Sequence, residues 1–297
     1  MAVDQPTLIV IGGPTASGKT KYAIELAQFF KTEIISADSR QVYKEISIGT
    51  AKPSPTELSI INHHFIDHCS IHDTFNAGIF EKQALAVLET LFITHPVVIV
   101  TGGTGLYINA LCYGLDDLPE ANEAIRINLQ NELNDHGLPW LFDKLERLDP
   151  QGSTTIDPKN PQRIMRALEL VITSGKSLDQ LKTKSIASRP FHIVKVMMNV
   201  ERELLYQRIN ERVDNMISDG LVEEAKKVYP YKYLKSLNTV GYAELFDYFD
   251  AKLTLKEAIE KIKQHTRNYA KRQLTWFRNE EDWVMKEAFD CERYRSL

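Results

Sequence analysis

The sequence has few of the features that would place it in several large classes of protein. It has three cysteines, Cys69, Cys112 and Cys291, which are too few and too far apart for a disulfide framework or a zinc site. It has no apolar run near the roughly 18–20 residues that a membrane span needs, and no basic leader before an apolar stretch. We therefore expect a cytoplasmic protein without membrane association, working as a monomer.

Two further absences concern nucleic acids and nucleotides. The formal net charge is −4, so the composition as a whole does not indicate nucleic-acid binding, and any basic surface must be local. The sequence has no Asn-Lys-x-Asp guanine-reading motif. The strand predicted at 97–100 ends in Thr101 rather than in the aspartate by which nucleotide hydrolases hold Mg²⁺. These absences disfavour a GTPase or a motor ATPase and leave open a P-loop kinase of a small metabolite.

What the sequence does contain is a phosphate-binding loop. Residues 13–20 read G-x-x-x-x-G-K-T between an apolar run that predicts a buried strand and apolar residues at helical spacing. A chance match is the alternative, and the flanking strand and helix count against it. The phosphate-binding residues predicted here, which the family resemblance described below assigns to a diphosphate, are Gly13, Pro14, Thr15, Ala16, Ser17, Gly18, Lys19 and Thr20. Backbone N–H groups and Lys19 would hold an anion, and the Thr20 hydroxyl suits Mg²⁺. The motif does not identify the phosphate compound.

The distribution of apolar residues predicts the fold class. Strands are predicted at 8–11, 33–36, 97–100 and 192–198, with helices between them. This alternation predicts an α/β fold with a doubly wound parallel sheet. Helical patterns without a clear strand predict a helical insertion at 114–190, which divides the core into 1–113 and 191–297, the latter ending in a basic helical region. Within the insertion, Asn160-Pro161 indicates the start of a helix, and Gly175 indicates its end.

Polar residues follow two of the predicted strands. Asp38 follows the second strand and would lie beside the phosphate loop, with a helix N-cap as its alternative role. Residues 101–107 read T-G-G-T-G-L-Y, a second glycine turn that offers backbone N–H groups and the Thr104 hydroxyl, unless it is a plain strand–helix turn. Two such turns suggest a clamp around a diphosphate. Arg208 and Arg212 share a helix face and could close over it, or form a solvated stripe.

Three other segments carry candidate ligands. Lys52, in a turn-rich loop, could reach an anion or be solvated. Residues 63–68 include three histidines, but adjacent histidines point apart and no partner cluster has ligand spacing, so a structural role near the site is preferred to a metal site. Residues 261–278 contain six basic residues, no acidic residue and interleaved aromatics. This pattern indicates a surface for a polyanion, the alternative being a basic helix face that is only solvated.

Together these segments resemble the tRNA dimethylallyltransferase, or tRNA isopentenyltransferase, family. The matching segments follow in order from about residue 8 to about residue 278, at 13–20, 35–43, 48–53, 101–107, 160–169, 239–242 and 266–276. Longer eukaryotic members carry a C-terminal zinc finger, which this sequence lacks, so the resemblance is to the bacterial type. One rival is a kinase or prenyltransferase acting on a free adenine nucleotide, which would need neither the insertion nor the basic segment. A non-catalytic RNA-binding protein is the other, and the intact Lys19, Thr20, Asp38 and Thr104 argue against it.

The resemblance implies a reaction and a set of residues. The family transfers a dimethylallyl group from dimethylallyl diphosphate to the exocyclic amino group of an adenine next to the anticodon of tRNA. Asp38 would be the general base, Thr104 would contact the departing oxygen, and Arg212 with Mg²⁺ would stabilise the leaving diphosphate. The residues expected to contact the tRNA anticodon stem-loop, including two from the basic segment, are Asp38, Ser39, Arg40, Gln41, Thr104, Arg126, Gln162, Arg163, Ile164, Met165, Arg166, Lys271 and Arg272.

Overall fold

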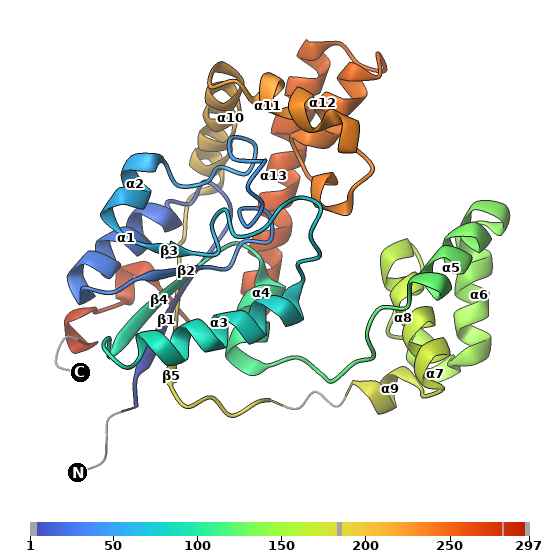
Figure 1. The fold of residues 1–297 in the computed structure, drawn as a ribbon, viewed down its shortest axis with the longest axis horizontal. Helices are drawn as coiled ribbons and strands as arrows, with labels where there is room; N and C mark the ends of the chain where they lie inside the picture. Colours follow the sequence, from blue (N-terminus) through green and yellow to red (C-terminus); the bar gives the residue numbers. More distant parts are fainter. Residues whose placement is uncertain (1–4, 183–185, 281, 295–297) are drawn as a thin grey trace. The chain divides into compact units, whose positions relative to one another are not determined.

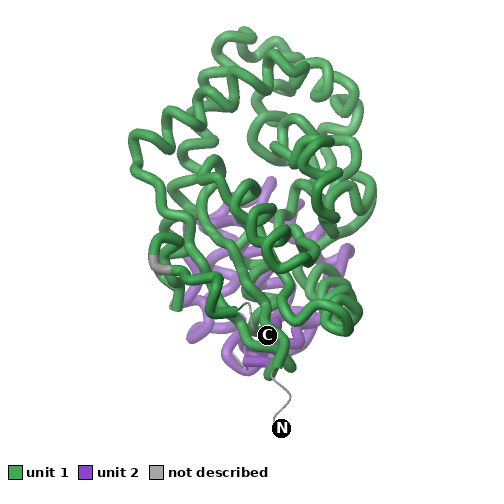
Figure 2. Tube along the Cα trace, turned by 90° about the vertical axis from the view of Figure 1, so that its left-hand side faces the viewer, with its two compact units in different colours: residues 1–113, 188–297 green, residues 114–187 purple. Residues whose placement is uncertain are grey.

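The computed structural model describes residues 5–182, 186–280 and 282–294. The chain forms two compact units (Figures 1 and 2): unit 1 comprises residues 1–113 and 188–297, and unit 2 comprises residues 114–187. The chain therefore leaves unit 1 once and returns to it after unit 2. The insertion predicted at 114–190 includes unit 2, whereas residues 188–190 belong to unit 1. Among the described helices, none combines the length and the apolar character that crossing a membrane requires.

A parallel sheet forms the centre of unit 1. Its strands, within the described residues, are β1 (Thr7–Gly12), β2 (Ile34–Ser36), β3 (His63–His64), β4 (Val97–Thr101), β5 (His192–Met197) and β6 (Trp283–Met285). Their order is β3-β2-β4-β1-β5-β6, and all neighbours are parallel. The α/β class and the parallel sheet are confirmed. Since β1 lies between β4 and β5, the loop that follows it begins at the middle of the sheet's carboxyl edge.

Helices cover both faces of this sheet (Figure 1). The described α-helices of unit 1 are α1 (Lys19–Phe30), α2 (Pro55–Ile60), α3 (Ala77–Leu91), α4 (Gly105–Tyr113), α10 (Arg202–Ser218), α11 (Leu221–Val228), α12 (Tyr242–Phe249) and α13 (Leu255–Asn279). Successive side chains of a strand point to opposite faces. Ile9 and Ile11 of β1 pack with α1, whereas Leu8 and Val10 pack in a larger cluster with α3 and α4. This two-sided burial is that of a doubly wound sheet.

Two edge strands differ from the prediction, which had four strands. β3 has two residues and pairs only with β2, and β6 has three residues and pairs only with β5. Neither is long enough to show the alternation by which a strand is recognised in a sequence. Both strands form because a neighbouring strand offers an unpaired edge.

The described residues of unit 2 form helices and connecting segments, and no strand. Its helices are α5 (Glu123–His136), α6 (Leu138–Leu148), α7 (Pro150–Ser153), α8 (Pro161–Ser174) and α9 (Leu178–Leu181). The predicted start of α8 is confirmed, because the Asn160 side chain accepts the N–H of Arg163 at 3.1 Å and Pro161 follows it. The predicted end is also confirmed, since Gly175 caps the helix with a φ of 66°. Leucines from α5, α6, α8 and α9 form a core that belongs to this unit alone.

The chain leaves and re-enters unit 1 at neighbouring points. Arg189, which follows the return, donates from Nε to the carbonyl of Leu111 at 2.9 Å and pairs with Glu81 of α3 at 2.6 Å. The ammonium of Lys195 lies 5.2 Å from the ring centre of Tyr113, the last residue before unit 2. These contacts hold the two ends of unit 1 together independently of the insertion.

Candidate active site

The phosphate loop (residues 13–20) connects β1 to α1. Gly18 caps α1 with a φ of 88°, and Gly13 has a φ of 144°, conformations that strain residues with a side chain. Lys19 Nζ donates to the carbonyl of Pro14 at 2.6 Å, so the loop closes around its own lysine. The N-terminus of α1 adds partial positive charge at the same place.

The two cations at this loop are poorly solvated. Burial lowers the pKa of Lys19 from 10.5 to about 7, the carboxylate of Asp38 raises it, and the guanidinium of Arg212 lowers it. Arg212 of α10 donates from Nη1 to the Thr15 hydroxyl at 3.3 Å, and burial lowers its pKa as well. Two partly desolvated cations favour the binding of a multiply charged anion. Arg208 is exposed and lies outside the cavity wall, so only one of the two arginines faces the loop.

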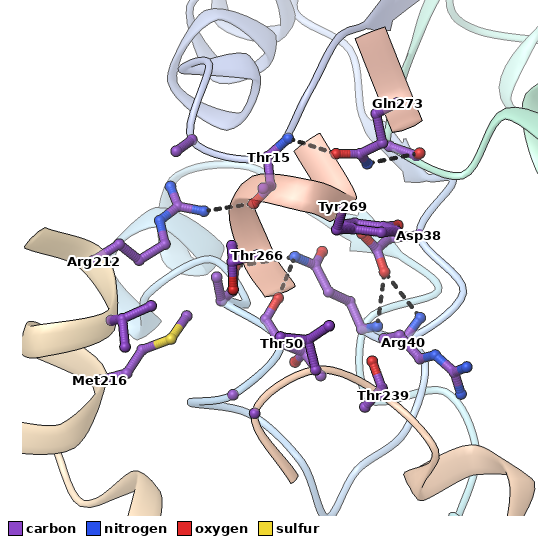
Figure 3. A pocket seen from close by; sticks show the side chains of 18 of the residues that line it. Thr15, Asp38, Arg40, Thr50, Arg212, Met216, Thr239, Thr266, Tyr269 and Gln273 are labelled. Carbon is purple, nitrogen blue, oxygen red and sulfur yellow. Dashed lines mark hydrogen bonds between the residues drawn. The ribbon is translucent and has the colours of Figure 1, made fainter. Parts of the chain in front are cut away.

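The loop forms one wall of a cavity in unit 1 of about 760 Å³ (Figure 3). The other walls come from the residues after β2 and β4, the loop at 49–51, the segment 238–241, and the helices α10 and α13. A cavity of this volume accommodates a small organic ligand. Of the residues predicted to hold a diphosphate, Thr15 to Thr20 and Arg212 line it, whereas Gly13 and Pro14 lie outside its wall.

Asp38 lies after β2 and lines the same cavity as Lys19. Its Oδ1 accepts the N–H groups of Arg40 at 2.9 Å and Gln41 at 3.3 Å. The alternative role of Asp38 was a helix N-cap. Its side chain does accept backbone N–H groups as a cap would, but the residues that follow form a turn and not a helix. The two backbone bonds fix the orientation of a carboxylate that also faces the cavity.

The second glycine turn lies beside this carboxylate. A Cβ on Gly102 would lie 2.1 Å from the carbonyl oxygen of Ala37, so only glycine fits there. Thr104 is not part of the cavity wall, but its Oγ1 accepts the N–H of Ser39 at 3.0 Å. Tyr269 of α13 lies beside Asp38 (Figure 3). Burial and then the Asp38 carboxylate raise the pKa of Tyr269 to about 12, while a hydrogen bond with Thr104 lowers it.

The side chains that follow Asp38 hold two neighbouring loops in place. Arg40 donates from its guanidinium to three carbonyls of the segment 235–238, at distances between 2.9 and 3.2 Å. Gln41 donates from Nε2 to the carbonyls of residues 50 and 51, at 3.1 and 3.0 Å. Because both loops border the cavity, Arg40 and Gln41 shape its walls.

Two candidates from the sequence have structural partners. Lys52 has a side chain only 5% exposed, pairs with Asp67 and lies outside the cavity wall, so both predicted roles, anion binding and solvation, are wrong. In the histidine segment, His64 pairs with Glu33 at 2.6 Å, whereas His63 lines the cavity. Across residues 5–182, 186–280 and 282–294, no three His, Cys, Asp or Glu side chains gather as metal ligands.

The basic segment 261–278 belongs to α13, and its basic residues have unlike surroundings. Lys263 and Arg267 bind side chains of α10 at 2.8 and 2.6 Å, so these two hold the helices together. The others line the cavity or are exposed, and they are Lys261, Lys271, Arg272 and Arg278. The solvated-face alternative therefore describes only part of the segment.

Gln273 is a cavity-lining residue that the sequence analysis missed. Its Oε1 accepts the N–H of Thr15 at 2.8 Å, and its Nε2 donates to the carbonyl of Gly103 at 2.8 Å (Figure 3). A signal was available in the helical pattern: Ala270, Gln273 and Phe277 share the buried stripe of α13, where an amide is unusual.

The predicted tRNA-contacting residues of the insertion begin α8. Gln162 and Arg163 are exposed and Met165 is half-buried. Ile164 has no exposed surface and lies in the core of unit 2, so its side chain is not available to a partner. The prediction for Ile164 therefore needs correction, because helical spacing turns this position inward while its neighbours face solvent.

Two further predicted tRNA contacts share one buried carboxylate. Glu169 is 1% exposed and accepts from Arg126 Nε and from Arg166 Nη1, each at 2.9 Å, and from the Asn122 N–H at 2.8 Å. Burial would raise the pKa of Glu169, but the hydrogen bonds from Arg166, Asn122 and Arg126 outweigh it and the pKa is lowered. Each guanidinium is thus partly engaged within unit 2.

Comparison with known proteins identifies relatives over almost the whole chain. The family model described as IPP transferase matches residues 41–280. A tRNA dimethylallyltransferase of Christiangramia forsetii is 50% identical over 273 residues, which are 92% of this chain and 90% of the relative. A tRNA dimethylallyltransferase 1 of Bacteroides fragilis is 45% identical over 276 residues, which are 93% of this chain and 92% of the relative.

Solved structures agree with the sequence relatives. The tRNA isopentenylpyrophosphate transferase of Bacillus halodurans superposes with a TM-score of 0.69 at 38% identity, covering 97% of this chain and 90% of its own. A eukaryotic dimethylallyltransferase, determined acting on tRNA, superposes with a TM-score of 0.78 at 27% identity, covering 97% of this chain and 75% of its own.

Proposed function

The chain belongs to the IPP transferase family, as a tRNA dimethylallyltransferase, and from this premise we propose how its cavity divides the work of prenyl transfer. The overall reaction is the transfer of a dimethylallyl group to tRNA. One observation carries the proposal: the phosphate loop and the Asp38 carboxylate line the same cavity. A leaving group and a base can therefore act on one reacting centre. The proposed setting is a cytoplasmic monomer.

The phosphate loop holds the diphosphate of dimethylallyl diphosphate. Lys19 and Arg212 support this role, because burial lowers the pKa of both and a bound diphosphate would stabilise their charged forms. Gly13 and Gly18 let the backbone N–H groups and the N-terminus of α1 face the same anion. ATP has no part in the reaction.

The side chains at this wall fit a magnesium ion. Thr20 and Thr101 both line the cavity, and the Thr101 hydroxyl is buried without a hydrogen-bond partner within the described parts of the chain. Mg²⁺ takes oxygen ligands and keeps several waters, so Thr20 would ligate it and Thr101 would accept or donate to one of those waters. When bound, the ion would neutralise charge on the leaving diphosphate.

Asp38 serves as the general base. The exocyclic nitrogen of the adenine forms a bond to C1 of the dimethylallyl group while the bond from C1 to the diphosphate oxygen breaks. The nitrogen loses its proton to the Asp38 carboxylate, and the diphosphate leaves with the electron pair. Thr104 donates to the departing oxygen. Its hydroxyl also bonds Tyr269, and its donation to the Ser39 hydroxyl spans a long 3.3 Å, so a charged acceptor can replace that contact.

The acceptor is an adenine next to the tRNA anticodon, which must leave its stack to reach the cavity. In unit 1 the stem-loop contacts are Ser39, Arg40, Gln41, Lys271 and Arg272. In unit 2 they are Arg126, Gln162, Arg163, Met165 and Arg166. Tyr269 lines the cavity, and Arg272 lies 5.8 Å from the centre of its ring, which supports this assignment, because an aromatic ring can stack on an unstacked base beside a cation that faces the tRNA backbone.

The proposal is tested by following labelled dimethylallyl diphosphate in the presence of Mg²⁺ and the absence of ATP. Transfer is expected to tRNA and to an isolated anticodon stem-loop, to stop when EDTA removes the metal, and not to occur with AMP. Label only in AMP would identify a nucleotide prenyltransferase, and a requirement for ATP would contradict the donor assigned to the loop.

The base is tested by Asp38→Ala. Single-turnover transfer with saturating tRNA should fall by about 10²–10⁴-fold, the usual contribution of general-base catalysis, with tRNA affinity nearly unchanged. The measurements are rapid-quench rates and filter binding of the same tRNA. Normal rates with weak tRNA binding would make Asp38 a binding residue only.

A further inference from the structure

We propose that Gln273 is a positioning residue for prenyl transfer. Its side-chain amide holds the phosphate loop in register with the second glycine turn, and so places the donor diphosphate relative to Thr104 and Asp38. The inference rests on the proposed binding of the donor by the phosphate loop, and it adds a residue on a distant helix to the catalytic arrangement.

The amide bridges two turns that follow different strands. Gln273 lies on α13, and it joins the N–H of Thr15, after β1, to the carbonyl of Gly103, after β4, by hydrogen bonds of 2.8 Å each (Figure 3). The side chain is 7% exposed. A Cβ on Gly103 would lie 2.2 Å from Gln273 Nε2, so the turn leaves room for this amide and for nothing larger at Gly103.

An amide is the side chain that suits both partners. It accepts from an N–H and donates to a carbonyl at the same time, which neither a carboxylate nor an apolar side chain does. A buried backbone group that loses its partner favours movement of the turn toward another one. Gln273 therefore specifies the distance between the two glycine turns.

Contacts with α10 and α13 hold the first part of the phosphate loop, at Thr15 and Ala16. Thr15 is held twice, through its N–H by Gln273 and through its hydroxyl by Arg212. Ala16 is buried with Leu205 and Ile209 of α10 and with Ala270 of α13. Because the Thr15 N–H already has a partner, the amide positions the loop rather than contacting the diphosphate. Residues 17–20 stay available to the donor.

Because Gln273 positions the phosphate loop and does not bind the donor, its loss should affect kcat and KM differently. A loop that has lost its brace still offers Lys19 and the N-terminus of α1, so the donor still binds. Misplacement of a reacting group by about 1 Å costs on the order of 10²-fold in rate. The loss should therefore appear in kcat, and the KM for the donor should change little.

The test compares Gln273→Met and Gln273→Glu with wild type and with Gln264→Met. Gln264 is an exposed glutamine on the same helix and lies outside the cavity wall, so it is a matched control. Gln273→Met should lower the rate at saturating tRNA and donor by about 10²-fold and change the donor KM by less than about 3-fold, whereas Gln264→Met should match wild type.

Gln273→Glu should show a pH dependence of its rate that a purely structural role would not give. Its carboxylate accepts the Thr15 N–H but cannot donate to Gly103, whereas its protonated form does both. Burial raises the pKa of such a carboxyl group. The rate of Gln273→Glu relative to wild type should therefore recover as the pH is lowered.

Several outcomes would overturn the proposal. Wild-type kcat in folded Gln273→Met would do so, as would a relative rate of Gln273→Glu that does not vary with pH. Loss of the melting transition in both variants would also do so, since Gln273 would then be a core residue. Absence of transfer by the wild type is a separate result, because it contradicts the proposed function and not the bridge.

Discussion

The ammonium of Lys19 lies partly buried beside Arg212, and burial lowers its pKa to about 7. The folded pKa is thus below the unfolded value of 10.5, so the charged form destabilises the free folded protein. This destabilisation is fully present below about pH 7 and has disappeared above the unfolded pKa. A bound diphosphate reverses the relation, since it stabilises the charged form.

Lys19→Met separates these two effects, because it removes the charge and keeps a side chain of similar length. Donor affinity, measured by calorimetry with Mg²⁺ and dimethylallyl diphosphate, should fall by about 10–10²-fold, as for a lost hydrogen bond to a charged group. The melting temperature of the free variant at pH 7 should rise by about 2 °C or more. A lower melting temperature would mean that the bond from Lys19 to the Pro14 carbonyl outweighs the cost of burial.

Individual residues differed in how far the sequence predicted them. Asp38 could be placed because the carboxyl ends of parallel strands share one edge of a sheet. Gln273 and Lys52 could not, because their partners lie outside the local sequence: Gln273 binds a loop 258 positions away, and Lys52 pairs with Asp67, which follows α2 and β3. The sequence shows that a polar side chain needs a hydrogen-bond or ion-pair partner when it is buried, but the neighbouring residues do not show which partner the fold supplies.

At the scale of elements, α13 serves two purposes. Its buried side carries Gln273 against the phosphate loop, and Lys263 and Arg267 bind it to α10. Its exposed side carries Lys271 and Arg272. The basic segment is therefore partly structural, although the sequence shows only its charge.

We expect Lys271 and Arg272 to contact tRNA phosphates. Changing both to alanine should weaken the binding of all accepted tRNAs about equally. The slope of the logarithm of the tRNA association constant against log salt should flatten by roughly 1.5, since each phosphate contact contributes about 0.7–0.9 to the slope. Transfer at saturating tRNA should be retained. Lys256→Ala, exposed on the same helix outside the basic segment, is the control and should leave the slope unchanged. An unchanged slope in the folded double variant would remove this face from the tRNA site.

The elements divide into those that the sequence specifies locally and those that it does not. The apolar runs of β1, β2, β4 and β5 can be recognised as strands from the sequence alone, and the ends of α8 can be recognised from Asn160 and Gly175. β3 and β6 have no such signal, because each is formed by pairing with one neighbour at the edge of the sheet. Local chemistry predicts the middle of this fold better than its margins.

At the scale of the whole molecule, the two units have separate cores. Among the described residues, the core clusters of unit 1 contain none from 114–187, and the core of unit 2 contains none outside that range. Every residue that lines the cavity lies in unit 1. Unit 1 should therefore fold and bind the donor without unit 2.

Replacing residues 114–187 by a short Gly-Ser linker tests this expectation. Arg189 and Leu111 already hold the two ends together, so a cooperative melting transition should remain. Donor affinity should stay within about 3-fold of wild type, whereas transfer to tRNA should fall by at least about 10²-fold as the contacts proposed for unit 2 are lost. Undiminished transfer by the folded deletion variant would exclude unit 2 from tRNA recognition.

The position of β5 beside β1 also determines the order in which this protein can assemble on the ribosome. β1 can pair with β4 once β4 has been synthesised. The other edge of β1 stays unpaired until β5 emerges, which happens only after all of unit 2. Unit 2 has its own core and can complete its folding in that interval. A nascent chain arrested before residue 192 leaves β1 as an edge strand whose unpaired edge is a template for aggregation. The cavity of unit 1, whose walls include α10 and α13, is completed only when nearly the whole chain has left the ribosome.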